Sequence, residues 1–214
     1  VMAGSEFHLT EYFGPILGIM TARTLDEATN LVNSIEYGLT SGLHSLDSGE
    51  IETWLEKVDG GNLYVNRGTT GAIVQRQPFG GWKKSAVGAG AKAGGPNYLF
   101  GLGSWKDAES RSRGADPTVN RVQALLAKLP EFDTVTVSGR AWLTRTARFD
   151  EDAWHNEFGK ARDVSNVGIE RNVFRYRRFP EPVIVRFSDG AEPTELLRVL
   201  LAAFRAGLNP VVSA

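Results

Sequence analysis

The sequence contains no cysteine among its 214 residues. This absence excludes disulfide bonds, cysteine-ligated zinc or iron–sulfur centres, and a thiol nucleophile supplied by these residues. The sequence also has no large excess of charge of one sign. Its 24 Lys and Arg and 25 Asp and Glu give a formal net charge of −1. A balanced chain has no overall basic field, so we expect neither nucleic acid nor an anionic membrane as a partner.

Long apolar runs are absent as well. No run approaches the ~18 residues that a membrane-spanning helix needs, so we expect no membrane span. The first residues, VMAGSEFHLTEYFGP, lack the charged start, apolar middle and cleavage site of a secretory signal, which favours a cytoplasmic protein. The last residues, NPVVSA, form an apolar segment where a natural terminus is more often polar. We therefore expect both ends to be cuts through a longer polypeptide.

Several common catalytic and binding motifs do not occur. The three histidines, His8, His44 and His155, stand in no ligand spacing, so we expect no metal site. No G-x-S-x-G motif is present, and we assign no catalytic residue. The glycines at 88–94 resemble a dinucleotide fingerprint, but the third comes one residue late and Gly95-Pro96 follows where a helix must begin. We interpret them as residues that let the backbone turn tightly.

What is present in the first hundred residues is an alternation of strand and helix patterns. Apolar runs and helical spacing predict strands at 15–22, 39–46 and 62–66 and helices at 24–35 and 48–58. Thr24 with Glu27 three residues later forms a capping-box pattern at the start of the first helix. This order predicts an α/β layer with parallel strands and right-handed crossovers.

The remainder predicts a linker and a second unit. Residues 104–117 are polar, charged and interrupted by glycine, which is typical of a linker. Further along, we predict helices at 119–129, 147–164 and 194–206 and strands at 134–137, 172–176, 183–187 and 210–214. The expected organisation is therefore a first domain at 1–103, a linker at 104–117, and the start of a second α/β domain at 118–214.

Two segments carry residues suited to binding a ligand. Glu11 stands two residues before Phe13, so a carboxylate that can bind a ribose accompanies a ring that can press against a flat heterocycle. The Gly-rich loop at 67–102 is too long to be a mere connection. Within it, Gly71 and Ala72 offer backbone N–H groups as a nest for a carboxylate, with Phe79 as an apolar wall. The alternative is that these residues only cap and pack.

Taken together, these motifs resemble a known family. The E-x-F-G-P motif at 11–15, followed by a Gly-rich loop with P-F-G-G, resembles the C-terminal part of the catalytic domain of the aldehyde dehydrogenase superfamily. The pattern TTGAIVxRQPFGG…GAGAKAGGPNYL resembles the L-glutamate γ-semialdehyde (1-pyrroline-5-carboxylate) dehydrogenases within it. The resemblance covers about residues 6–102. Residues 115–214 resemble the C-terminal extension of bifunctional proline-utilisation proteins, which is aldehyde-dehydrogenase-like in fold.

The resemblance implies roles for individual residues. Glu11 would contact the nicotinamide ribose of NAD and Phe13 would flank the nicotinamide. Gly71 and Ala72 would anchor the α-carboxylate of glutamate semialdehyde, and Phe79 would line the aliphatic stem of this substrate. The implied reaction is hydride transfer from a thiohemiacetal to NAD and hydrolysis of the thioester to glutamate. It needs a cysteine that this chain lacks, so the isolated chain is expected to be an inactive fragment.

Further partners and alternatives accompany this hypothesis. The resemblance implies a proline dehydrogenase domain in the same polypeptide or complex, and a homo-oligomer. A rival hypothesis is a non-catalytic module, in which the region after Pro117 forms a lid or an assembly surface. A nucleotide site at 183–214 is disfavoured, because the turn at 188–191 has one glycine and Asp189 would repel a phosphate.

Overall fold

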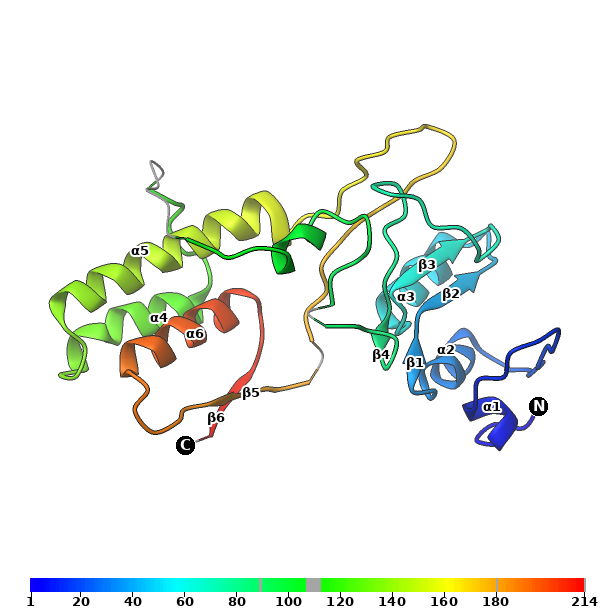
Figure 1. Ribbon diagram of the computed structural model, residues 1–214, viewed down its shortest axis with the longest axis horizontal. Coiled ribbons are helices and arrows are strands. Elements are labelled where there is room, and N and C mark those ends of the chain that lie inside the picture. Colours follow the sequence, from blue (N-terminus) through cyan, green and yellow to red (C-terminus); the bar gives the residue numbers. More distant parts are fainter. Residues whose placement is uncertain (89, 107–112, 180, 214) are drawn as a thin grey trace. The chain divides into compact units, whose positions relative to one another are not determined.

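The computed structural model describes residues 1–88, 90–106, 113–179 and 181–213 (Figure 1). It divides into two compact units, residues 1–105 with 164–172, and residues 106–163 with 173–214. Residues 164–172, which the sequence placed in the extension, are thus grouped with the first unit. The domain boundaries at 103 and 117 stay predictions, and the linker lies partly outside the described residues.

The centre of the first unit is a strand–helix–strand motif. Strand β2 (Thr40–Leu43) pairs in parallel with β3 (Asn62–Val65), and α3 (Ser48–Lys57) connects them (Figure 1). Trp54 of α3 and Tyr64 of β3 are buried, with exposed fractions of 3% and 5%. This arrangement confirms the predicted α/β layer with parallel strands.

Side-chain caps begin both helices of this layer. Helix α2 (Leu25–Asn33) starts after Thr24, whose hydroxyl accepts from the Glu27 N–H at 3.1 Å, as the sequence predicts. Helix α3 starts after Asp47, whose carboxylate accepts from the N–H groups of the next turn at 2.8 and 3.0 Å. The caps satisfy donors that have no partner within the helix and so fix where each helix begins.

The strand predicted at 15–22 is wrong. A short helix, α1 (Glu6–Leu9), precedes this segment, but within the described residues 15–22 form no strand. A strand requires a neighbour that completes its backbone hydrogen bonds, and an apolar run alone cannot supply one. Leu17 and Ile19 are 83% and 69% exposed, so the segment presents its apolar side chains to solvent.

The short pair β1 (Tyr37–Gly38) and β4 (Trp82–Lys83) is antiparallel.

Three helices form the core of the second unit. Helices α4 (Asn120–Lys128), α5 (Val137–Ala153) and α6 (Pro193–Arg205) lie against one another (Figure 1). The buried apolar residues of this core, of which Leu129 and Val135 lie in the connection between α4 and α5, are Val122, Leu129, Val135, Leu143, Ala147, Leu197 and Leu201. Strands β5 (Val183–Arg186) and β6 (Pro210–Ser213) pair in parallel on either side of α6 in the chain, which confirms the predicted β-α-β order.

Helix α5 differs most from expectation. The strand predicted at 134–137 is wrong, and the helix predicted from residue 147 begins at Val137. The helix begins here because the Thr136 hydroxyl accepts from the Gly139 N–H at 3.0 Å and caps it. The β-branched residues around Thr136 favour a strand locally, which explains the wrong prediction. The strand predicted at 172–176 is also wrong, because Phe174 forms only an isolated bridge with Arg162.

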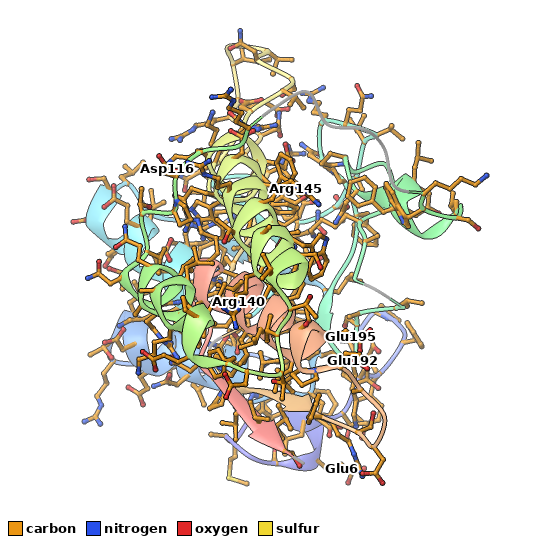
Figure 2. All side chains as sticks on the ribbon, turned by 90° about the vertical axis from the view of Figure 1, so that its left-hand side faces the viewer. Glu6, Asp116, Arg140, Arg145, Glu192 and Glu195 are labelled. Carbon is orange, nitrogen blue, oxygen red and sulfur yellow. The ribbon has the colours of Figure 1, made fainter. Side chains whose placement is uncertain are left out.

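Acidic residues stabilise the start of α6. The Glu195 carboxylate accepts from the Glu192 N–H at 3.2 Å, and Figure 2 labels both glutamates at this end of the helix. Negative charge is favourable here because it opposes the positive end of the helix dipole. Along the same helix, Arg198 donates to both oxygens of Asp150 on α5 at 2.7 Å, which joins the two helices.

Candidate functional site

Gly71 and Ala72 lie in the loop after β3, where backbone donors are left unpaired. Gly71 has a φ of +98°, and a β-carbon at this position would meet no atom within 4 Å. Within the described part of the chain, the N–H groups of Gly71 and Ala72 donate to no protein acceptor. Two adjacent donors in exposed backbone can bind a carboxylate from solution.

The opposite side of the Gly71 peptide is held from within the unit. The hydroxyl of Tyr64, a residue of β3 that is 5% exposed, donates to the Gly71 carbonyl oxygen at 2.8 Å. With its nitrogen turned towards Gly71, the Gln77 amide donates to the same oxygen at 3.0 Å and accepts from Arg67 at 2.5 Å. These contacts fix the carbonyl group, so the orientation of the loop is set by a buried strand.

A cluster of charged side chains includes two arginines of this loop. The Glu170 carboxylate pairs with Arg76 and lies 3.2 Å from the Arg67 guanidinium. Asn172 donates to the same carboxylate at 3.0 Å. The Asn172 amide and the Arg76 guanidinium lower the pKa of the Glu170 carboxyl below its ordinary value, because both stabilise the anion.

Asn62 fixes the segment that carries Phe79. Its amide nitrogen donates to the Pro78 carbonyl at 2.9 Å, and its oxygen accepts from the Gly80 N–H at 3.1 Å. Phe79 and Ala93 exchange two backbone hydrogen bonds of 3.0 and 2.8 Å. The backbone on both sides of the Phe79 ring is therefore restrained.

Lys92 binds the same segment through its ammonium group. The Nζ atom donates to the carbonyl oxygens of Gly61 and Gly80 at 2.5 and 2.6 Å and to Asn62 Oδ1 at 3.2 Å. Burial lowers the pKa of the Lys92 ammonium to about 8, because desolvation disfavours the charged form. Lys92 thus links the backbone at Gly61 to the backbone at Gly80, next to Phe79.

The Phe79 ring lines a groove. The groove has a volume of about 540 Å³, and Tyr98 and Phe100 form other parts of its wall. Phe79 is 40% exposed, which leaves part of its ring available to an apolar ligand. The ring can cover an aliphatic chain, as the resemblance implies for the stem of a substrate.

Glu11 and Phe13 lie in the segment between α1 and α2. Both are exposed, Phe13 to 93%. The preceding helix α1 contacts α2 through His8, which accepts from the Gly4 N–H at Nδ1 and lies with Nε2 3.0 Å from the Leu31 carbonyl oxygen. An exposed ring and an exposed carboxylate two residues apart are compatible with stacking on a heterocycle and binding a hydroxyl group.

The contacts that shape this site were missed by sequence reasoning. The sequence predicted Tyr64 only as part of the strand at 62–66, and Glu170 lies 94 residues after Arg76. Asn62 and Lys92 were also not singled out by the sequence. The role of a ligand-binding residue stays a prediction for Glu11, Phe13, Gly71, Ala72 and Phe79.

The described residues contain neither a candidate membrane span nor a candidate metal site. None of the helices there is both long and apolar enough to cross a bilayer. In those same parts of the chain, no group of three or more histidine and acidic side chains converges as metal ligands would.

Comparison with known proteins identifies the relationship of the first unit. The aldehyde dehydrogenase family matches residues 1–104. The 1-pyrroline-5-carboxylate dehydrogenase of Bacillus subtilis (strain 168) is 49% identical over 90 residues, which are 42% of this chain and 17% of that protein. The protein of the same name from Geobacillus kaustophilus (strain HTA426) is 47% identical over 90 residues, with the same coverage.

A solved structure extends the likeness to the rest of the chain. Proline Utilization A (PutA) from Corynebacterium freiburgense is 45% identical, with a TM-score of 0.84 over 100% of this chain and 20% of its own. The chain thus spans less than a quarter of the length of each of these relatives. The match confirms the predicted fold and the resemblance of the second half to proline-utilisation proteins. Residues 1–104 of this chain are therefore similar to the aldehyde dehydrogenase family.

Proposed function

We propose that this chain is part of an NAD-dependent dehydrogenase that oxidises L-glutamate γ-semialdehyde to L-glutamate in proline catabolism. The observation that carries the proposal is the pair of adjacent N–H groups at Gly71 and Ala72, which donate to no acceptor among the described residues, in a loop where Tyr64 holds the Gly71 carbonyl. The match to the aldehyde dehydrogenase family, which spans residues 1–104, covers this loop. The chain supplies the substrate anchor, and the nucleophilic cysteine comes from other residues of the complete protein.

Binding of the substrate uses two features of the loop. The N–H groups of Gly71 and Ala72 donate to the α-carboxylate, and the positive end of each amide dipole faces the anion. The Phe79 ring covers the aliphatic stem and removes its apolar surface from water. The aldehyde end then extends away from the anchor by the length of the stem, so the anchor sets where the reacting carbon lies.

Glu11 and Phe13 suit NAD because both side chains are exposed and lie two residues apart. Phe13 would pack against the nicotinamide, and the Glu11 carboxylate would accept from a ribose hydroxyl. When bound, NAD supplies the hydride acceptor. The overall reaction balances as aldehyde, NAD⁺ and water giving carboxylate, NADH and two protons.

The test is NADH formation with pyrroline-5-carboxylate, which is in equilibrium with the semialdehyde. The complete gene product is expected to form NADH, whereas the 214-residue chain is expected to form none because it has no cysteine. NADH production by the 214-residue chain, or its absence with the complete product, would overturn the proposal.

Partners follow from the same proposal. A proline dehydrogenase domain in the same polypeptide would deliver the substrate, and a homo-oligomer and a cytoplasmic location are further expectations. The rival function, a non-catalytic lid or assembly module, applies to the region after Pro117. Deleting residues after Ser104 from the complete protein separates the two. Unchanged turnover supports a catalytic core that ends there, and a changed oligomeric mass or altered aldehyde access supports the module.

A further inference from the structure

The segment at 164–172, late in the chain, contacts the loop that carries the predicted carboxylate anchor. Residues 164–172 belong to the same compact unit as the loop that carries Gly71. Glu170 of this segment contacts Arg67 and Arg76, which lie 103 and 94 residues earlier in the chain. The two arginines flank Gly71 and Ala72 in sequence, so one carboxylate contacts the chain on both sides of the anchor residues.

Polar contacts rather than apolar burial position this segment. Val164 and Ile169 are 68% and 93% exposed, whereas the side chain of Glu170 is 25% exposed. Asn172 donates to Glu170 at 3.0 Å and to Ser165 at 3.0 Å, which folds the segment around the carboxylate. A partly buried carboxylate between two guanidinium groups is stabilised more strongly than an exposed ion pair.

The contacts continue from Glu170 to the anchor. The Arg67 guanidinium lies 5.3 Å from the centre of the Tyr64 ring and donates to the Gln77 amide oxygen. Tyr64 and Gln77 are the two side chains that donate to the Gly71 carbonyl oxygen. The position of Arg67 therefore affects both groups that orient the Gly71 peptide.

We propose that Glu170 is a positioning residue for the dehydrogenase: through Arg67 and Arg76 it holds the loop around Gly71 in the conformation that binds the substrate carboxylate. This inference rests on the proposed function. Without the Glu170 carboxylate, the two guanidinium groups repel each other, and either one can compete with the Gly71 and Ala72 N–H groups for the α-carboxylate. Binding of the carboxylate weakens, while the chemistry at the aldehyde is unaffected.

The test compares two substrates in the complete gene product. Glu170→Gln keeps the shape of the side chain and removes its charge. We expect the KM for glutamate semialdehyde to rise about tenfold, with kcat changed by less than about twofold. Butanal, which has no carboxylate, is expected to give the same kcat/KM in the variant and the wild type. Glu170→Asp, which retains the charge, is expected to recover part of the loss.

Controls separate positioning from a general loss of structure. Glu157 accepts from Arg162 at 2.5 Å in the second unit, so Glu157→Gln removes a similar ion pair that includes no residue of the loop, and the kinetics with both substrates are expected to stay unchanged. Arg76→Met should not add to the effect of Glu170→Gln, because both remove the same contact. Equal losses with semialdehyde and butanal would mean a structural role and overturn the inference.

Hydrogen exchange gives a readout independent of activity. In Glu170→Gln, amides of residues 67–77 are expected to exchange faster, whereas amides of α2 and α3 keep their wild-type rates. Wild-type exchange in the loop together with wild-type KM would overturn the inference but leave the proposed function intact. Failure of the wild-type protein to oxidise the semialdehyde would instead overturn the proposed function, and the exchange data would still decide whether Glu170 holds the loop.

Discussion

The Tyr64 hydroxyl donates a hydrogen bond of 2.8 Å to the Gly71 carbonyl oxygen. Tyr64 belongs to the buried strand β3, and Gly71 to the exposed loop that follows it. The bond restrains the Gly71 peptide, because the strand fixes the position of the Tyr64 hydroxyl. A backbone anchor for a carboxylate gains affinity when it is fixed before the ligand arrives.

Removing this hydroxyl tests that relationship. Tyr64→Phe is expected to lower the free energy of unfolding by about 1 kcal/mol, the contribution of one hydrogen bond. In the complete gene product, the KM for glutamate semialdehyde should rise while turnover of butanal is retained. Steady-state kinetics with both aldehydes and urea unfolding check the two effects. An unchanged KM would show that Gln77 alone orients the loop.

Lys92 is expected to titrate far below an ordinary lysine. Its pKa of about 8 means that the folded protein loses this proton at a pH where the unfolded chain, with a pKa of 10.5, still holds it. The unfolded state then binds more protons, so the free energy of unfolding should rise between pH 8 and 10.5. Lys92→Arg stays charged and should lack this rise. An NMR titration of lysine side chains with the Lys92 midpoint near 10.5 would contradict the account.

Glu151 is a fully buried acidic residue of the second unit. It is 0% exposed, accepts from Thr118 at 2.7 Å, and lies 2.6 Å from Arg205. Glu151→Ala leaves Arg205 without its partner and is expected to destabilise the unit by about 3–5 kcal/mol. Protection of α5 amides from hydrogen exchange measures the effect.

An exposed ion pair on the same helix provides the comparison. Arg148 pairs with Asp116, whose side chain is 80% exposed. Asp116→Ala should cost less than about 1 kcal/mol because water screens this pair. Equal losses of protection in the Asp116 and Glu151 variants would show that burial of Glu151 adds nothing.

Apolar side chains at 16–19 predict self-association of the isolated chain. Ile16, Leu17 and Ile19 are 54%, 83% and 69% exposed. Contiguous exposed apolar surface favours association. Light scattering on the purified 214-residue chain is expected to give masses above 23.3 kDa that increase with concentration. A monomer with a sharp cooperative melt would contradict this, whereas Leu17→Lys should reduce the association.

The sequence predicted the helices well where caps and apolar spacing agreed. Thr24 marked the start of α2, and the apolar stripe of α6 gave its position within about one residue. The residues at 134–137 show the limit, because Val135 and Val137 favour a strand locally while Thr136 caps a helix. Strands at 15–22 and 172–176 were wrong because pairing depends on a partner that local sequence does not specify.

The sequence predicted the loop residues of the candidate site. It did not predict the ion pairs that hold this loop. Gly71, Ala72 and Phe79 stand in a recognisable Gly-rich pattern, and the structure places them in the loop after β3. The contact between Glu170 and Arg76 joins residues 94 positions apart, and an isolated glutamate in a polar segment carries no local sign of such a contact. Long-range ion pairs depend on how the chain folds back, which no periodicity encodes.

The most direct test of the account uses Gly71 itself. A β-carbon at a φ of +98° is strained by about 1–2 kcal/mol, although the space around it is open. In the complete gene product, Gly71→Ala is expected to lower kcat/KM for glutamate semialdehyde about tenfold and to leave butanal unaffected. Gly103→Ala, which also meets no atom within 4 Å and has no positive φ, should match the wild type with both aldehydes. If Gly71→Ala keeps wild-type kcat/KM for the semialdehyde, or loses activity equally with butanal, the loop is not the carboxylate anchor.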